Sequence, residues 1–264
     1  MPEGPEIYTL KEYLKKEITG KRVKKIISKS KTKVRLPKES KIEKVEAKGK
    51  LIWIKTKEYY MHIHLMLTGW IYIDEEPENV KYIIELNGKK IYISSRRKFT
   101  KLEIYNKKKH KEEKEKLGVD ILSEEFTKER FRELIKKTRK MISAYLMEQK
   151  TFAGLGNYIK NESLYISEID PEKASKELEE KEIERLYKAI KYVSYSTLIE
   201  QLEDYEIKIP KEIKKRRPKK IQIPYRYKIY GREKDDKGRE VRMEKIGGRK
   251  TYYVEKVQKK EKKK

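Results

Sequence analysis

Apolar residues recur with a helical period at the start of the chain and with a strand period after it. Ile7, Leu10, Leu14 and Ile18 are spaced by three or four residues, so we predict a helix over residues 5–18 that ends before Gly20. Eight short strand-like segments follow, which is typical of a β-sandwich or barrel. They cover residues 22–27, 42–48, 51–56, 60–64, 69–73, 81–86, 90–94 and 101–105, with Asn87-Gly88 as a hairpin turn between two of them.

The pattern changes at residues 107–116, a charge-dense run that we interpret as a linker because it can bury little. Beyond it the spacing of apolar residues returns to a helical period. We predict helices over residues 123–137, 142–147, 157–165 and 182–201, with a tight turn at Gly154-Leu155-Gly156-Asn157.

The last part of the chain alternates between basic and strand-like segments. Residues 210–220 show no core-forming pattern, so we expect an exposed basic loop there. Strands are predicted over residues 225–230, 240–246 and 250–256, and Gly247-Gly248 joins the last two as a hairpin turn. We expect residues 259–264 to be disordered.

Charge narrows the class of partner. The 264 residues include 70 Lys and Arg against 44 Asp and Glu, a formal net charge of +26. Such an excess favours a polyanion, because neutralising phosphates releases counterions. No apolar run of about 18 residues and no signal-peptide pattern is present, so nucleic acid is favoured over a membrane. The chain has no cysteine, which excludes disulfides and cysteine-ligated zinc and leads us to expect an intracellular protein.

The first six residues carry candidate chemistry. If Met1 is removed, Pro2 becomes the N-terminus and its secondary amine is free to attack an aldehyde-like carbon. The resulting iminium is a strong electron sink, and Glu3 supplies an acid beside the amine. The same residues can also form an ordinary helix start, where Pro5 and Glu6 are favoured for conformational and electrostatic reasons.

A possible metal pair stands on one predicted strand. His62 and His64 form a His-x-His pattern, but no third ligand stands at a suitable spacing. We therefore expect neither a metal nor any other cofactor.

Five motifs in chain order resemble the formamidopyrimidine-DNA glycosylase / endonuclease VIII family of DNA repair enzymes. The resemblance spans nearly the whole chain, and the opening and the Gly-x-Gly-Asn segment are its most specific parts. The motifs are Pro2-Glu3-Gly4-Pro5-Glu6, Lys50 within Ala47-Lys48-Gly49-Lys50-Leu51, His64-Leu65-Met66-Leu67-Thr68-Gly69, Leu146-Met147-Glu148-Gln149-Lys150 through Gly154-Leu155-Gly156-Asn157 to Glu162-Ser163-Leu164, and Tyr230-Gly231-Arg232 with Arg249-Lys250-Thr251-Tyr252-Tyr253.

The resemblance implies an α+β fold with two domains. Residues 1–117 would form a catalytic β-sandwich with an N-terminal helix. Residues 118–264 would form a helix–two-turn–helix domain with a finger hairpin at about 225–258 and a basic tail. The family's common finger binds zinc through two cysteine pairs, whereas Val254 and Val257 stand where the second pair would be. We expect a zincless finger held by Tyr and Val packing.

The family's function implies a bifunctional DNA glycosylase and AP lyase that flips a damaged nucleotide out of double-stranded DNA. The enzyme would act as a monomer on duplexes that contain damaged bases or abasic sites. By resemblance, Pro2 attacks C1′ and Glu3 protonates the sugar ring oxygen. The other implied site residues are Glu6 and Lys50 in the catalytic site, His64, Asn157, Arg249 and Lys98 on DNA, and Leu67, with Phe99 as a second candidate, in the gap left by the flipped base.

Three departures bear on the substrate. Leu67 replaces the usual Met, and Lys98 stands where the family often has Arg. The glycine-rich loop of 8-oxoguanine enzymes has no match, and its region is the basic segment 210–220. These departures favour oxidised pyrimidines and hydantoins over 8-oxoguanine. Two other classes remain: a non-catalytic DNA-binding protein with the same fold, and an RNA-binding protein suggested by charge alone.

Overall fold

A computed structural model describes residues 2–31 and 34–259 of the chain. Its internal contacts divide the chain into an N-terminal unit, Met1–Lys116, and a C-terminal unit, Leu117–Lys264. Among the described residues, no helix combines the length and the apolarity needed to span a bilayer.

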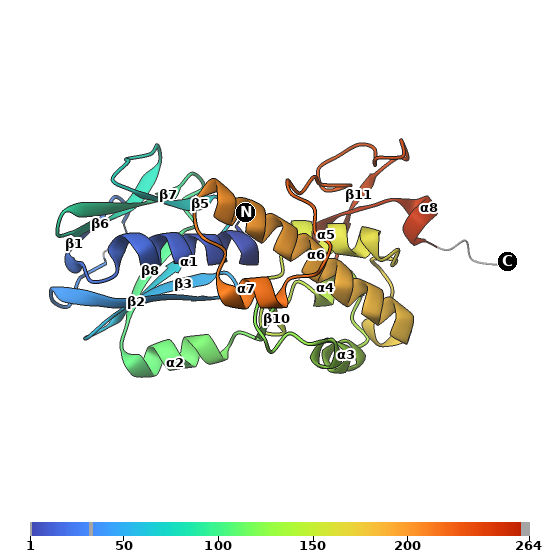
Figure 1. Cartoon of the computed structure of the whole chain (residues 1–264), viewed down its shortest axis with the longest axis horizontal. Coiled ribbons are helices and arrows are strands. Elements are labelled where there is room, and N and C mark those ends of the chain that lie inside the picture. The colour runs from blue at the N-terminus through green and yellow to red at the C-terminus, as the bar shows by residue number, and fades with distance from the viewer. Residues whose placement is uncertain (1, 32–33, 260–264) are drawn as a thin grey trace. The chain divides into compact units, whose positions relative to one another are not determined.

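The N-terminal unit contains helix α1 and an antiparallel sheet of eight strands, and all eight predicted strands are confirmed (Figure 1). The sheet has the order β5-β7-β6-β1-β2-β3-β4-β8. The elements are α1 (Gly4–Ile18), β1 (Arg22–Ser28), β2 (Ser40–Lys48), β3 (Leu51–Thr56), β4 (Tyr60–His64), β5 (Gly69–Ile73), β6 (Val80–Leu86), β7 (Lys89–Ser95) and β8 (Lys101–Tyr105).

The two halves of this sheet form the expected sandwich around α1. Strands β1 and β2 pair only at Arg22 with Lys41 and at Val23 with Ser40, so the sheet is nearly divided there. In Figure 1, β6 and β7 lie above α1, and β2 and β3 lie below it. The apolar side chains of α1 pack into one core with residues from both halves. This burial fixes the helix, and therefore the first residues of the chain, on the sheet.

The predicted linker at residues 107–116 is wrong, because the run forms helix α2 (Lys107–Glu115) within the N-terminal unit. Asn106 begins the helix by accepting the backbone N–H of Lys109 at 2.8 Å. His110 is buried, with its ring stacked on Tyr60 at 3.9 Å and its Nδ1 at 2.8 Å from His62 Nε2. Charge density had suggested that the run buries nothing, but one aromatic residue is enough to attach it.

The C-terminal unit begins with a short parallel pair, β9 (Val119–Asp120) and β10 (Phe152–Ala153). The helix predicted over residues 123–137 starts too early. Thr127 is its N-cap and accepts the backbone N–H of Arg130, while the Ser123 hydroxyl donates to the Asp120 carbonyl in a turn. The helices here are α3 (Lys128–Lys136), α4 (Ile142–Tyr145), α5 (Asn157–Ile166) and α6 (Glu180–Asp204), with a 3₁₀ turn at Ser175–Glu177.

The basic segment 210–220 is not the unstructured loop that we predicted. It contains helix α7 (Lys211–Arg216), in which Ile213 is fully buried. A single apolar residue among charges does not form a recognisable period, which is why the pattern was missed.

The strand predicted over residues 225–230 is also wrong. The backbone N–H groups of Lys228, Ile229 and Tyr230 donate to the Glu162 carboxylate instead of to a neighbouring strand. The hairpin that follows is confirmed as β11 (Arg242–Ile246) and β12 (Arg249–Tyr253). Gly247 and Gly248 join the two strands with φ of 57° and 80°, the left-handed conformation that a two-residue type I′ turn requires.

The chain end continues beyond β12 as a short helix. Helix α8 (Glu255–Gln258) follows where the predicted strand over residues 250–256 would have continued. Of the end expected to be disordered, residues 260–264 lie outside the described residues. Lys259 forms an ion pair with Glu172 at 2.8 Å.

Candidate functional site

The first residues of the chain are held by reciprocal hydrogen bonds. Glu3 is the N-cap of α1, and its backbone N–H donates to Glu6 Oε2 at 2.8 Å. The Glu3 carboxylate in turn accepts the backbone N–H of Glu6, which completes a capping box. Pro2, Glu3 and Glu6 are all buried. The helix-start role of Glu6 is therefore present, and it fixes the position of Glu3, the residue that follows Pro2.

Lys50 and His64 lie at the same end of neighbouring strands. Lys50 is in the two-residue turn between β2 and β3, not in a strand, and Gly49 before it has φ of 59°. Leu51, which follows Lys50, pairs with His64 at the end of β4. Burial lowers the pKa of His64, and Lys101 adds to this although the Glu103 carboxylate, 3.9 Å away, opposes it. His64 is thus a neutral hydrogen-bonding group at pH 7.

The loops that carry Leu67 and Phe99 are hydrogen-bonded to each other. The backbone N–H of Arg97 donates to Thr68 Oγ1 at 3.1 Å, and the Thr100 hydroxyl donates to the Leu65 carbonyl at 3.2 Å. Any side chain at Gly69 would collide with Thr100 Oγ1 and with the Leu65 carbonyl, so glycine allows the close approach. The two loops form one structure, although 30 residues separate them in sequence.

Three apolar side chains project from these joined loops. Met66 is 46% exposed and Phe99 is 51% exposed, whereas Leu67 is half-buried. Met66 has φ of 55°, an unusual conformation for its side-chain type. Sequence reasoning chose Leu67 and missed Met66, although the run Leu65-Met66-Leu67 directly after a strand was visible. Exposed apolar side chains of this size are available to contact a ligand.

Lys98 lies at the tip of the second loop. It is exposed, and its φ is 59°. Its carbonyl accepts a hydrogen bond from Lys81 Nζ at 2.7 Å, and the same ammonium donates to the Thr100 carbonyl at 2.7 Å. The backbone of the loop is therefore fixed while the Lys98 side chain faces solvent.

In the C-terminal unit, α5 holds the hairpin strand that carries Arg249. Asn157 Nδ2 donates to the Lys250 carbonyl at 2.9 Å, Lys160 Nζ donates to Thr251 Oγ1 at 2.9 Å, and Asn161 Oδ1 accepts the backbone N–H of Tyr252 at 3.2 Å. These three helix residues share one face because they are spaced by three and four. Arg249 itself is exposed at the start of β12.

The same contacts bear on the predicted role of Asn157. Its amide nitrogen has two hydrogens, and the bond to Lys250 uses one of them. The second can still donate to a phosphate. Sequence reasoning missed the fully buried Lys160, and the only available signal was a lysine among the apolar positions of the predicted helix.

Glu162 anchors the base of the finger. Its fully buried carboxylate accepts the Tyr225 hydroxyl at 2.6 Å and three backbone N–H groups at 2.8 to 2.9 Å. Burial raises the pKa of Tyr225, and the neighbouring Glu162 charge raises it further. The carboxylate thus organises the chain that the sequence had suggested was a strand. Glu162 had been recognised only as part of a motif.

The finger is held by apolar packing and by a buried aspartate. Ile229, Val241 and Val254 form a small core, against which Tyr252 and Val257 pack. Asp235 accepts Arg239 Nε at 2.7 Å and the Tyr165 hydroxyl at 3.0 Å. Burial alone would raise the pKa of Asp235, but hydrogen bonds from Arg239 and Tyr165 outweigh it and lower the pKa to about 2. No cysteine takes part in these contacts, because the chain has none.

His62 of the His-x-His pattern packs in the protein interior. His62 is fully buried between Trp53 and Tyr105, and burial, together with the His110 and His64 charges, lowers its pKa to about 3. Within the described part of the chain, no group of three or more His, Cys, Asp or Glu is placed to hold a metal ion.

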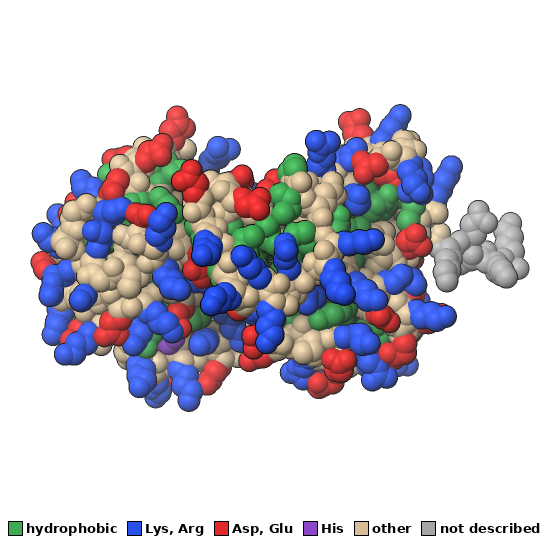
Figure 2. All heavy atoms as spheres, in the orientation of Figure 1, with side chains coloured by type: hydrophobic (Ala, Val, Ile, Leu, Met, Phe, Trp, Pro, Cys, Tyr) green, Lys and Arg blue, Asp and Glu red, His purple; other side chains and the backbone are tan. Residues whose placement is uncertain are grey.

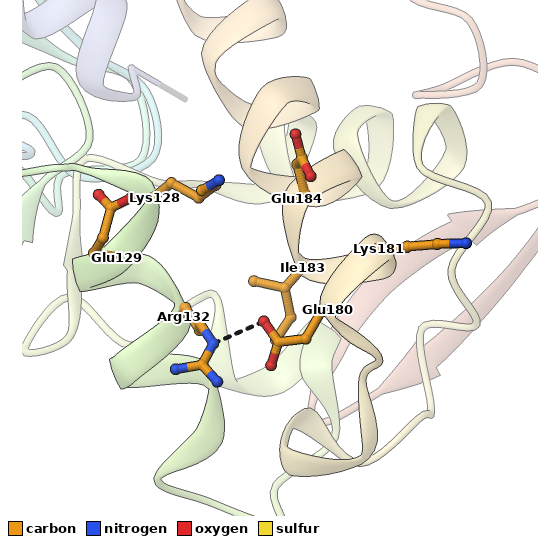
Figure 3. A pocket seen from close by; sticks show the side chains of 7 residues that line it. All are labelled: Lys128, Glu129, Arg132, Glu180, Lys181, Ile183 and Glu184. Atoms are coloured by element: carbon orange, nitrogen blue, oxygen red, sulfur yellow. Dashed lines mark hydrogen bonds and ion pairs between the residues drawn. The ribbon is translucent and has the colours of Figure 1, made fainter.

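A surface hollow between α3 and α6 contains none of the predicted site residues (Figure 3). Six of its seven lining residues are charged, with both signs present, and Arg132 Nε donates to Glu180 Oε2 at 2.7 Å across it. Such internally paired charges join two helices and leave little net field for a charged ligand.

Comparison with known proteins identifies the family of both parts of the chain. The N-terminal domain of formamidopyrimidine-DNA glycosylase matches residues 1–102, and the H2TH domain of the same enzyme matches residues 117–203. The formamidopyrimidine-DNA glycosylase of Bacillus cereus is 27% identical over 207 residues, which are 72% of this chain and 75% of that protein. The Listeria monocytogenes enzyme of the same name is 28% identical over 215 residues, 73% of this chain and 77% of its own.

Solved structures share the fold. The MutM (Fpg) protein of Thermus thermophilus has a TM-score of 0.82 and 24% identity, covering 97% of this chain and 98% of that one. A Lactococcus lactis formamidopyrimidine-DNA glycosylase, bound non-covalently to DNA with an abasic site, has a TM-score of 0.80 and 23% identity, covering 98% of this chain and all of that one. With both domain matches in order, the chain belongs to the formamidopyrimidine-DNA glycosylase / endonuclease VIII family of DNA repair enzymes, which are DNA glycosylases with AP lyase activity.

Proposed function

We propose that this protein excises oxidised bases from double-stranded DNA and then cleaves the strand, using the amine of Pro2 as nucleophile after removal of Met1. The observation that carries the proposal is the buried Glu3, the residue that follows Pro2, fixed in position by the capping box at the start of α1. In the proposal, the Pro2 amine is the nucleophile and the neighbouring Glu3 is the acid that Schiff-base chemistry at a sugar requires.

In the proposed reaction the Pro2 nitrogen bonds to C1′ of the flipped nucleotide, and the C1′–N bond to the base breaks. The proton lost by the Pro2 amine is transferred to the departing base. Glu3 in its acid form protonates the sugar ring oxygen, so the ring opens and the C1′–N bond to Pro2 becomes an iminium. The iminium makes the C2′ proton acidic. Its loss expels the 3′ phosphate by β-elimination, and δ-elimination then expels the 5′ phosphate.

The DNA contacts would come from both units. Lys50 and His64 lie together at one sheet end, where a charged donor and a neutral donor can bind neighbouring phosphate oxygens. Asn157, Arg249 and Lys98 would hold the phosphate backbone in the same way, with Arg249 capable of two parallel hydrogen bonds. These roles rest on the family resemblance, together with the exposure of Arg249 and Lys98.

The gap left by the flipped base would be filled from the joined loops. Leu67 is the residue at the family position, and Phe99 is the second candidate. The exposure of Met66 adds a third apolar group on the same rigid structure. Apolar side chains inserted into a base stack compensate for part of the lost stacking.

The proposed substrates are oxidised pyrimidines and hydantoins in preference to 8-oxoguanine. The glycine-rich loop of the 8-oxoguanine enzymes is absent, and the region holds the basic helix α7. We propose that a base pocket with α7 in place of the glycine-rich loop accepts a different set of bases. We propose a monomer as the active form.

Single-turnover excision on matched duplexes tests this function. Oligonucleotides with thymine glycol, a hydantoin, 8-oxoguanine or an abasic site would be compared with the Met1-processed protein and with Glu3→Gln. We expect the first two lesions to be excised fastest and Glu3→Gln to lose at least about a hundredfold in rate, as general acid catalysis typically contributes. Specific binding to damaged duplex without excision of any lesion would instead support a non-catalytic DNA-binding protein.

A further inference from the structure

The segment from Lys211 to Lys220 has the highest net positive charge for its length in the described part of the chain. Seven of its ten residues are Lys or Arg and one is Glu, a net charge of +6. Figure 2 shows Lys and Arg side chains gathered over and around the region where Figure 1 places α7. The exposed members are Lys211, Lys214, Lys215, Arg217, Lys219 and Lys220.

These charges are held on a fixed backbone. Ile213 is fully buried, and Arg216 donates through one Nη to the Leu122 carbonyl at 2.7 Å. After the segment, the backbone N–H of Gln222 donates to Ser196 Oγ at 3.1 Å and the backbone N–H of Tyr225 donates to Glu200 Oε2 at 2.9 Å. The segment is therefore tied to the C-terminal unit at α7 and again just beyond its end.

The orientation of the side chains follows from helix geometry. Lys211, Lys214 and Lys215 are spaced by three and four residues, so they lie on one face of α7, opposite the buried Ile213. Arg217 has extended backbone, with φ of −62° and ψ of 149°, as a residue before proline prefers. The basic residues thus continue past the end of the helix, with Lys219 and Lys220 in a bend after Pro218.

Within the residues that the structure describes, none of these seven basic side chains forms an ion pair. Another charge-dense segment behaves differently. Helix α2 and Lys116 together have six Lys and three Glu, and Lys109, Lys111 and Lys116 are paired to Glu113, Glu115 or Glu112 at 2.7 to 3.8 Å. A high density of lysines is therefore not enough, in this chain, to leave those lysines without ion-pair partners.

We propose that the segment from Lys211 to Lys220 is a binding surface for the phosphate backbone of double-stranded DNA. A fixed row of exposed, unpaired cations matches a polyanion with regularly spaced charges, and binding would release counterions without reading sequence. The inference rests on the proposed action on DNA. The segment would contribute affinity for duplex DNA, and this contribution would be separate from the chemistry at Pro2.

The salt dependence of binding tests the surface. The variant would change Lys214, Lys215, Lys219 and Lys220 to Gln. The control would remove the same four charges from α2 through Lys107→Gln, Lys108→Gln, Lys111→Gln and Lys116→Gln. The measurement is the slope of log Kd against log salt concentration for an undamaged DNA duplex, with the full-length protein.

We expect the slope to fall by about 2 to 4 for the α7 variant, roughly one for each lost phosphate contact. The α2 control should change it by less than about 1, since long-range charge is screened at moderate salt. Equal changes in the two variants, or no change in either, would overturn the proposal. Because Kd on undamaged duplex involves no Schiff base, failure here is distinguishable from failure of the proposed reaction.

Discussion

Helices α2 and α7 are both rich in lysine, but they differ in whether those lysines form ion pairs with other described residues. Lysines of α2 alternate with glutamates that lie three or four residues away, and Figure 2 shows acidic and basic side chains mixed there. Helix α7 carries one Glu, and none of its Lys and Arg side chains forms an ion pair with another described residue. The difference shows that local pairing, more than the number of lysines, decides whether a basic segment is available to a partner.

The two helices also differ in how they are attached. Helix α2 docks through His110, an aromatic residue that can be protonated and that contacts His62. Helix α7 docks through Ile213, which cannot change charge, and through Arg216. The attachment of α2 should therefore depend on pH, whereas that of α7 should not.

The largest expected effect comes from removing the α7 anchor. Ile213→Ala should lower the free energy of unfolding of the C-terminal unit by about 2–5 kcal/mol, because a fully buried isoleucine leaves a cavity. Urea denaturation followed by circular dichroism measures it. The matched control is the exposed Lys214→Ala, for which we expect about 0.5 kcal/mol or less. If the two variants were equally stable, α7 would not be anchored as described.

Acidification should loosen α2 and leave α7 unchanged. The pKa of His62 is about 3 in the folded protein and about 6.5 when unfolded, so its contribution to stability is complete above pH 6.5. That contribution is lost as the pH falls toward 3, by at most about 1.4 kcal/mol per pH unit for one histidine.

Amide hydrogen exchange at pH 7 and pH 5, corrected for intrinsic rates, checks this difference. Protection of α2 should decrease at pH 5, while protection of α7 stays the same. His62→Phe should weaken the dependence of α2 protection on pH in this range, because only His110 of the pair can still titrate. Acid loosening of α7 by the same amount would contradict the assignment of the effect to the histidine pair.

The smallest effect should come from the ion pairs of α2. Glu113→Gln removes the partner of Lys109 at 3.0 Å and of Lys116 at 2.7 Å, both on the surface. We expect a loss below about 1 kcal/mol at low salt and less at high salt. Urea midpoints at two salt concentrations measure it. A loss that does not depend on salt would mean that Glu113 stabilises α2 in some other way.

The sequence predicted the regular elements well where burial was continuous. All eight strands of the N-terminal unit and α1 follow apolar periods that repeat over several residues. Three of the failures share one cause: a single residue made the decisive contact. His110 attaches α2, Ile213 attaches α7, and the Glu162 carboxylate captures the backbone of residues 228–230. One contact from a distant part of the chain leaves no period to detect.

The candidate site was predictable in part for the same reason. The sequence motifs singled out five candidate site residues: Pro2, Glu3, Lys50, His64 and Arg249. The supporting contacts were not visible, because Lys160 meets Thr251 across 91 residues and Thr100 meets Leu65 across 35. Such contacts depend on the folded chain and carry no local signature.

The central claim is that Pro2 is the nucleophile, and trapping followed by mapping tests it most directly. The protein would be mixed with an abasic-site duplex and borohydride, which reduces the iminium to a stable amine, and the linked peptide would be identified by mass spectrometry. We predict one adduct on Pro2 in protein that lacks Met1, and none on Pro2 in protein that retains Met1. An adduct on a lysine such as Lys50, or no adduct in the Met1-processed protein, would contradict the account.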